Sequence, residues 1–325
     1  MMRRIVFDIT VGRWHFTYAN RIEIKRDVEA LTETCRITLP RRLRLRERDI
    51  FAGASRLIKA GDPVTVKCGY GTAETVFTGY VSRVEVDTPV VIECQDAMYL
   101  LKKTEVQPRS WKSATVSDVV SYIAPQVGDT SLVDMSLGTF RVTNKPTAPT
   151  AARVLEYICS TYSLRAYFLR GALHVGLAYT TDGARTYDYF FRPRSWSDAI
   201  ITSSLKYNEA EDVKVRVKAI SIQRDNTRLE AEAGDPGGEL RTVHFQNMTT
   251  EELKAAAEAA VDKLKVAGYT GSFTTFGEPV VQKADRVTLH SDDRPQGLYT
   301  VQAVTYTAGV GVGIRQEITI GSKIG

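Results

Sequence analysis

The chain has 325 residues, enough for two or three domains, because a single hydrophobic core stops growing well before that length. Hydrophobic residues make up 43% and charged residues 25%, which argues against a disordered chain. The net charge of +5 is a small excess of 43 basic over 38 acidic residues and does not by itself imply nucleic-acid binding.

The first residues, MMRRIVFDITVGRWHFTYA, break their apolar run at Asp8, which predicts a strand and not a signal peptide. No window approaches the roughly 20 apolar residues that a membrane helix needs. We therefore expect a soluble chain that is made without export and does not insert into a membrane by itself.

Up to about Ala97 the sequence alternates between apolar and polar residues with a period of two. The segments RIEIKR, CRITLP, PVTVKC, TVFTGYVSRVEV and PVVIEC follow this pattern and are separated by Gly, Pro and Asp. Short strands at this spacing are typical of a sandwich or barrel. Between Leu39 and Ile58 lies a basic connection that is too long for a tight hairpin, so we interpret it as an excursion with a function of its own.

The period changes to that of a helix after CQDAMYLLKKTEV. Two segments, 116–123 and 151–162, carry apolar residues at helical spacing; Pro125 ends the first and Pro149 suits the start of the second. LRAYFLRGALHVGLAY then predicts a hairpin that turns at Gly171. These elements predict a small α/β insert between two β-rich parts.

Strands return from Ser203, and one long helix interrupts them. Thr249 and Glu252 form a capping box, and an apolar stripe follows before Gly268 closes a helix of about residues 250–267. The stripe is mostly alanine, which favours close packing against a sheet. It consists of Leu253, Ala257, Ala260 and Leu264. Three further strands end the chain.

Two stretches of the chain resemble each other. GDPVTVKCGYGTAETVFTGYVSRVEV (61–86) and ADRVTLHSDDRPQGLYTVQAVTY (284–306) each carry an alternating strand, a polar turn with Gly, and an aromatic residue leading into a second strand. The pattern alone leaves open whether the chain contains an internal duplication or two unrelated antiparallel meanders.

No catalytic constellation is visible. GxSxG, SxxK and HExxH are absent, and the glycine-rich GVGVGI (309–314) precedes a strand and not a helix, so we expect a hairpin connection there. The histidines are expected to be ordinary strand or edge residues: His15, His174, His244 and His290. We predict no enzyme, with no catalytic, metal or cofactor-binding residues and no cofactor.

Several polar features have simple structural interpretations. The four isolated cysteines are expected to be buried thiols: Cys35, Cys68, Cys94 and Cys159. The carboxylates of Glu209, Glu211 and Asp212 suit a solvated strand end better than acid–base work or a cation site. The basic run 40–48 suits a solvated or partner-facing loop, PTAP (146–149) suits a helix stop and start, and Thr249 in the sequon Asn247-Met248-Thr249 suits a helix cap.

The order of these segments resembles that of the baseplate hub proteins of bacteriophage tails. The similarity is to the late control protein D family, the Mu-like tail hubs and the hub half of the valine-glycine repeat spike proteins of type VI secretion. It is carried by AGDPVTVKCGY, VFTGYVSRVEVDTPVVIECQDAMYLLKK, VSDVVSYI, VLEYICSTYSLRAYF, GALHVG, FGEPVVQKADRVTL and GLYTVQAVTY.

The resemblance implies a mainly β (α+β) fold in which two tube-like antiparallel β-barrel domains flank a small α/β insert. We expect the N-terminal barrel at residues 1–99, the insert at 100–195, and the second barrel with its long helix at 196–325. The family further implies a homotrimer with pseudo-sixfold symmetry that adapts a sixfold tail tube to a threefold spike.

The implied partners are the chain itself, tail tube proteins, other baseplate proteins and a separate tail spike protein, within a virion tail assembled in the bacterial host cytoplasm. Spike and lysozyme-like domains of the kind some hubs carry are not visible in the sequence, which suggests a bare adaptor.

Two other classes of function compete with the hub. One is a component of the tail tip that binds or degrades peptidoglycan through the α/β insert. The other is a basic nucleic-acid-binding protein, which the small excess charge disfavours, so we expect no specific nucleic-acid binding.

Overall fold

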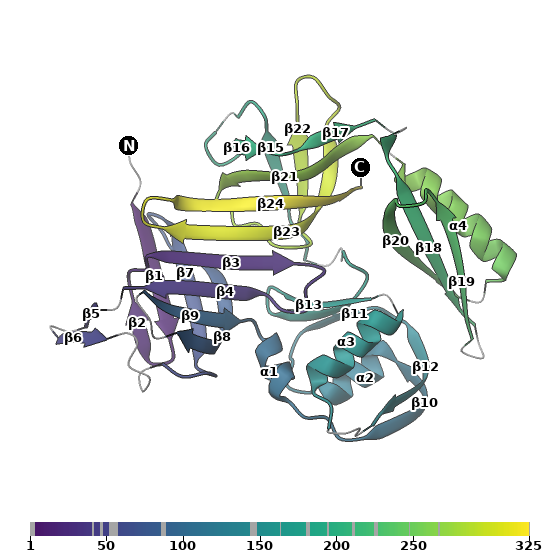
Figure 1. Cartoon of the computed structure of the whole chain (residues 1–325), viewed down its shortest axis with the longest axis horizontal. Helices are drawn as coiled ribbons and strands as arrows, with labels where there is room; N and C mark the ends of the chain where they lie inside the picture. The colour runs from purple at the N-terminus through teal and green to yellow at the C-terminus, as the bar shows by residue number, and fades with distance from the viewer. Residues whose placement is uncertain are drawn as a thin grey trace.

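The computed structural model of the chain describes residues 4–40, 42–45, 48–51, 58–85, 89–143, 148–162, 164–179, 183–193, 195–209, 212–223, 227–246, 248–265 and 267–324. Antiparallel strands dominate these residues, and one sheet of 14 strands draws on both the N-terminal and the C-terminal parts of the chain (Figure 1). The predicted mainly β fold is confirmed.

The N-terminal strands follow the predicted alternation. In β3, for example, Ile22 and Ile24 are fully buried while Arg21 and Lys25 are exposed. Apolar side chains from β1, β3, β4, β7, β8 and β9 meet in one core, so the sheet curls around it. The strands are β1 (Ile5–Val11), β2 (Trp14–Phe16), β3 (Arg21–Asp27), β4 (Thr34–Leu39), β5 (Arg42–Leu45), β6 (Arg48–Phe51), β7 (Pro63–Tyr70), β8 (Glu74–Glu85) and β9 (Val90–Gln95).

The C-terminal strands curl around a second core, which is rich in tyrosine. It contains Tyr189, Phe273 and Tyr299 together with aliphatic side chains of β22, β23 and β24. The strands are β15 (Thr186–Phe190), β16 (Ile200–Ser203), β17 (Lys206–Asn208), β21 (Gly268–Phe276), β22 (Arg286–His290), β23 (Gly297–Gly309) and β24 (Gly313–Lys323).

The predicted α/β insert has a core of its own, where α2 and α3 cover small sheets. Both predicted helices are confirmed, as is the hairpin that turns at Gly171, whose φ is +91°. The elements are α1 (Met98–Lys103), β10 (Arg109–Thr115), α2 (Val116–Ile123), β11 (Thr130–Leu132), β12 (Ser136–Val142), α3 (Ala151–Tyr162), β13 (Arg165–Leu169) and β14 (Ala172–Gly176).

A fourth core lies under the long helix α4 (Thr250–Leu264). The helix packs on a three-stranded sheet of β18 (Val215–Ile222), β19 (Arg228–Gly234) and β20 (Glu239–Gln246), with Leu253 and Ala257 fully buried (Figure 1). The predicted capping box and the packing of the alanine-rich stripe are both confirmed.

Two expectations about the C-terminal part of the chain need correction. The helix α4 ends at Leu264 rather than near 267, because Gly268 already begins β21, where a Cβ would lie 2.9 Å from the Tyr299 hydroxyl. Four strands follow the helix within 267–324, and not three, since the Thr- and Ser-rich β21 lacks an apolar alternation. Part of the basic connection 40–58 forms its own hairpin of β5 and β6.

The hairpin of β23 and β24 belongs to both large cores. Val301 and Ile318 lie in the C-terminal core, whereas Tyr306 and Ile314, farther toward the turn, lie in the N-terminal core. The residues 309–314 form the turn of this hairpin, as expected. Because β23 also pairs with β3, the two curled halves share one continuous sheet.

The two halves repeat the same strand order. Neighbouring strands run β1-β7-β8-β9-β4-β3 in the first half and β15-β22-β23-β24-β21-β16 in the second, with β17 continuing the line of β16 along β21. Strands at the same position in these two spatial orders also have the same rank along the sequence of their half. One difference is that β1 pairs antiparallel with β7, whereas β15 pairs parallel with β22.

The turn that leads into β7 is repeated before β22. In the first turn the Asp62 N–H donates to the Lys59 carbonyl over 3.1 Å, and the Lys59 N–H donates to the Asp62 carboxylate over 2.8 Å. In the second turn the Asp285 N–H donates to the Gln282 carbonyl over 3.3 Å, and the Gln282 N–H donates to the Asp285 carboxylate over 2.8 Å.

The residue before each aspartate also plays the same part. Gly61 has a φ of +92° and Ala284 a φ of +63°, a region that L-residues rarely adopt. The Gly61 N–H donates to the Val81 carbonyl over 2.8 Å, and the Ala284 N–H donates to the Val301 carbonyl over 2.9 Å. A break in register follows each valine. The structure thus answers the question left open by the sequence: the two stretches are one repeated unit.

Candidate interaction surface

The insert is anchored where it meets both halves of the sheet. Arg165, the first residue of β13, donates to the Glu29 carboxylate of the N-terminal half over 2.6 Å. Arg170, in the turn after β13, donates to both oxygens of Asp285 in the C-terminal half over 2.7 and 2.8 Å. Together the two arginines fix one strand of the insert to both repeats.

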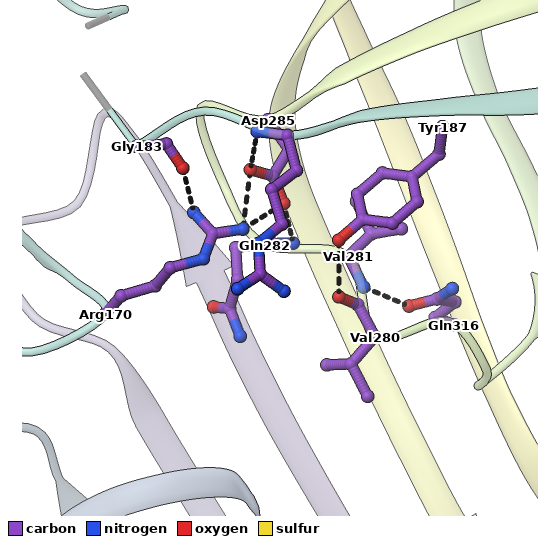
Figure 2. Close-up of polar contacts among 9 residues, drawn as sticks. Arg170, Gly183, Tyr187, Val280, Val281, Gln282, Asp285 and Gln316 are labelled. Atoms are coloured by element: carbon purple, nitrogen blue, oxygen red, sulfur yellow. Dashed lines mark hydrogen bonds and ion pairs between the residues drawn. The ribbon is translucent and has the colours of Figure 1, made fainter. Parts of the chain in front are cut away.

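Asp285 is the polar centre of this junction (Figure 2). Its carboxylate is fully buried and accepts hydrogen bonds from Arg170, from the Gln282 N–H over 2.8 Å and from the Arg185 N–H over 2.9 Å. Nearby, Gln316 accepts from the Val281 N–H, which holds the same segment against β24. The charge of Asp285 is therefore compensated by several donors, as a buried carboxylate requires.

A second set of buried charges lies at the same junction. The Arg26 Nε donates to Glu33 over 3.1 Å, and the Lys283 Nζ lies 4.0 Å from the other Glu33 oxygen. Asp96 accepts from the Glu33 N–H over 3.0 Å and from the Met98 N–H over 3.1 Å. These groups come from both halves of the chain.

Burial disfavours the charged forms of two of these groups. It raises the pKa of Asp96 to about 6, although the nearby Lys283 ammonium acts in the opposite direction. Burial likewise lowers the pKa of Lys283, against the attraction of Glu33 and Asp96. An aromatic face takes part as well, since the Lys283 Nζ lies 5.3 Å from the centre of the Tyr167 ring.

The described part of the large sheet has several open edges, among them β2, most of β15 and the two stretches that follow. The pairing of β7 with β8 ends at Tyr80, so β8 from Arg83 to Glu85 pairs with β9 on one side only. At the other end of the sheet, β16 and β17 pair only with β21. Ile201 of β16 keeps 39% of its surface exposed. Open edges with apolar side chains are sites where another strand can pair.

The histidines lie in strands, as predicted, and far apart in the sequence. His15 lies 2.9 Å from Asp8, and His290 lies 2.9 Å from Asp188. His174 contacts the Leu177 carbonyl over 2.8 Å, and His244 lies on β20. Across the residues that the structure describes, no three His, Cys, Asp or Glu side chains are grouped to hold a metal ion.

The cysteines are free, and Cys35, Cys68 and Cys94 are buried as expected, whereas Cys159 is only partly buried. Burial raises the pKa of Cys94 to about 12 and that of Cys68 to about 11, which leaves little reactive thiolate near neutral pH.

The remaining predicted polar features lie at the surface or outside the described residues. Glu209 forms an ion pair with Arg294 over 2.9 Å, while Glu211 and Asn247 fall outside the described residues, as do parts of 40–48 and of 146–149. No local sequence pattern predicts the buried junction, because its charged residues are contributed one or two at a time by distant segments. None of the helices among the described residues combines the length and apolar character needed to cross a membrane.

No protein-family model matches the sequence, and no curated protein matches it. Solved structures do match. A tail protein of Neisseria meningitidis has a TM-score of 0.65 at 16% identity, covering 98% of this chain and 96% of that one. The 43 kDa tail protein of the Shewanella oneidensis prophage MuSo2 has a TM-score of 0.62 at 14% identity, covering 98% of both chains.

A component of the E. coli type VI secretion system is also similar, with a TM-score of 0.57 at 9% identity over 97% of this chain and 76% of that one. That protein is described as structurally similar to the bacteriophage T4 tail proteins gp27 and gp5. The matches span nearly the whole chain, including both halves and the insert. The chain therefore has the fold of tail proteins from bacteriophages and of their counterparts in type VI secretion.

Proposed function

We propose that the chain is a structural hub protein of a phage-type tail, located in the virion tail and assembled in the cytoplasm of the bacterial host. The observation that carries this proposal is the repeated unit, which gives one chain two equivalent curled halves in a single sheet. Structural proteins of tails with the same fold support it.

The repeat suits a ring of three chains. Three copies would present six similar halves to a sixfold tail tube, while each copy carries one insert and so offers three positions to a threefold spike. Arg165 and Arg170 anchor this single insert across both halves of its chain, which would reduce six positions to three. The proposed partners are thus further copies of the chain, tail tube proteins, other baseplate proteins and a separate spike protein.

Parts of the chain have separate roles in this proposal. Residues 1–99 would form one tube-like barrel, residues 196–325 together with β15 would form the other, and residues 100–185 would form the insert domain. We propose that the basic run 40–48, which includes β5 and the first residue of β6, contacts a neighbouring subunit or ring. Charge reversal of this run that leaves tail assembly intact would argue against such a contact.

The mass of the purified protein in solution tests the hub. Light scattering is expected to give three chain masses, and negative-stain images are expected to reveal a ring with a central hole and an apparent sixfold outline. A monodisperse monomer at high concentration, without a hole, would contradict the proposal.

A second candidate function is binding of peptidoglycan at the tail tip. A cavity of about 830 Å³ lies between the insert and β20, lined by Leu164, Leu177 and Phe245 among others, and Tyr157 on α3 is 57% exposed. Sugars stack on exposed aromatic rings and fill such cavities. Co-sedimentation of the protein with purified sacculi would favour this function. Complete absence of the protein from the sacculus pellet would rule out peptidoglycan binding.

A further inference from the structure

The repeat predicts which strand pairs with each of the two open edges. Within the chain, β23 leaves β22 after its break in register and pairs with β3, which joins the second half to the first. Elements equivalent to β23 and β3 lie at two open edges: β8 corresponds to β23, and the line of β16 and β17 corresponds to β3. In the described part of the chain, this equivalent pair is not joined.

The repeated hydrogen bonds fix which residues of β8 and β23 correspond. Val81 is equivalent to Val301, because each exchanges hydrogen bonds with the turn before the preceding strand. The break in register comes next in both strands, so the segment 83–85 is equivalent to 303–305.

The residue pairs between neighbouring strands show which residues of β3 and β16 are equivalent. In the first half, Val84 pairs with Ile92, and Ile92 pairs on its other side with Ile37. In the second half, Val304 pairs with Ile318, and Ile318 pairs on its other side with Phe273. Following the register one strand farther makes Ile22 of β3 equivalent to Ser203 of β16.

The same offset relates the rest of β3 to β17. Lys25 pairs with Thr34, and Lys206 pairs with Thr270 at the equivalent position of β21. Within the chain, Lys25 lies opposite Thr305 of β23. Lys206 should therefore lie opposite Glu85, the residue of β8 that is equivalent to Thr305.

We propose that the end of β8 of one copy pairs antiparallel with β17 of a second copy, with Glu85 opposite Lys206. In this register Val84 faces Tyr207, and Arg83 faces Asn208. The proposal rests on the proposed function, because it names the strands through which copies of the hub meet. Each copy contributes one edge of each kind, so the contact is head-to-tail and repeats around a ring.

The exposure of the two edges fits a missing strand. Val304 is 1% exposed beside β3, whereas its equivalent Val84 is only partly buried beside the open edge. Along β17, Lys206 is exposed, and Tyr207 and Asn208 are only partly buried. A neighbouring strand would cover these side chains and pair the free N–H and C=O groups.

The charges across the contact also fit. The Glu85 carboxylate forms ion pairs with Arg83 and Arg36 of its own sheet, yet its side chain remains 33% exposed. Lys206 is exposed on β17. Opposite charges directly across antiparallel strands attract each other, so an acidic residue facing Lys206 favours this register.

Cysteine cross-linking tests the register. Residues directly opposite in an antiparallel pair have Cα atoms about 4.5–5.5 Å apart, which a disulfide can span. In the double variant Glu85→Cys/Lys206→Cys, mild oxidation is expected to link copies into dimers and trimers on a non-reducing gel. The two single variants measure the background from the native cysteines.

A matched control shifts one partner along the strand. In Glu85→Cys/Thr202→Cys the second cysteine lies four residues away, about 13 Å in an extended strand, which is beyond disulfide reach. We expect at least about ten times more cross-linked product from the first pair than from the control pair. Equal yields from both pairs would overturn the proposed register.

The mass of the unoxidised variants separates this inference from the proposed function. If the double variant Glu85→Cys/Lys206→Cys forms trimers that do not cross-link, the proposed edge pairing is wrong and the proposed hub function is unaffected. Monomers of the unmodified chain would sink both. Cross-linking of the variant to a tail tube protein in place of a second copy would also overturn the pairing proposed here.

Discussion

Asp62 and Asp285 occupy equivalent turns but face different surroundings. Asp62 is only partly buried and accepts the Lys59 N–H. Asp285 is fully buried and also binds Arg170 of the insert. One copy of the repeated turn has thus become the anchor for the insert, while the other has kept only its local role.

Asp285→Asn is expected to destabilise the protein much more than Asp62→Asn. The first change leaves the Arg170 guanidinium without its carboxylate in a largely buried place, at a cost of about 3 kcal/mol in the free energy of unfolding. The second weakens one exposed turn and should cost about 1 kcal/mol or less. Urea unfolding of both variants measures the difference, and equal losses would contradict the anchoring role.

The buried carboxyl of Asp96 predicts a pH dependence of stability. Its pKa in the folded protein is raised to about 6, from 3.8, so folding favours the protonated form. The contribution of this group to stability is full below about pH 4 and is lost as the pH rises through 6, by up to about 3 kcal/mol.

Asp96→Asn should remove this decline, because an amide does not titrate. The measurement is the free energy of unfolding of both proteins at pH 4 and pH 7, with Asp293→Asn at an exposed position as a control. Parallel pH profiles for the unmodified protein and Asp96→Asn would contradict the assignment.

At the residue scale, sequence reasoning succeeded for the buried cysteines. Cys35 and Cys94 are predicted as buried thiols because they are isolated from other metal ligands in the sequence, and both are buried on paired strands. It failed for Lys283 and Asp96, whose burial depends on partners that lie far away in the sequence. No local pattern indicates that Lys283 will meet Glu33.

At the scale of elements, helices and hairpins were predictable because their signals are local. The helices α2 and α3 carry complete apolar stripes, and two residues, Thr249 and Glu252, are enough to predict the N-cap of α4. The strands β16, β17 and β21 were harder to predict, since their exposed, polar residues follow no alternation. They form because they pair with neighbours, which only the assembled sheet provides.

The capping box of α4 predicts a local loss of stability. The Thr249 side chain accepts from the Glu252 N–H, and Glu252 accepts from the Thr249 N–H over 2.9 Å. Thr249→Ala removes the first contact and should lower the free energy of unfolding by about 1 kcal/mol. Thr250→Ala, one residue later and exposed, is the control and should change it by less than about 0.5 kcal/mol. Similar effects of both changes in thermal unfolding would rule out the cap as the cause.

At the scale of the whole molecule, the sequence predicted the mainly β class and the resemblance to tail hubs, and similar folds among tail proteins bear both out. It could not decide whether the two similar stretches were a duplication. The decisive evidence is the pair of turns around Asp62 and Asp285, whose hydrogen bonds join residues on separate strands.

Self-association is expected to respond to charges at the open edges. Glu85→Lys places like charges across the proposed contact with Lys206 and should weaken association several-fold, and Lys206→Glu should do the same. Combining the two changes should restore association. Glu74→Lys, at the other end of β8, is the control. The measurement is the fraction of trimers at increasing protein concentration, and failure of the double variant to recover would contradict the contact.

The hairpin shared by the two large cores also constrains how the chain can fold during its synthesis. Tyr306, Ala308 and Ile314 complete a core whose other buried members lie at or before Cys94, so the ribosome must make most of the chain before that core can close. Until then the edge of β3 stays without its partner β23. Until β23 is made, this edge of a nascent chain would be open to strand pairing with other nascent chains.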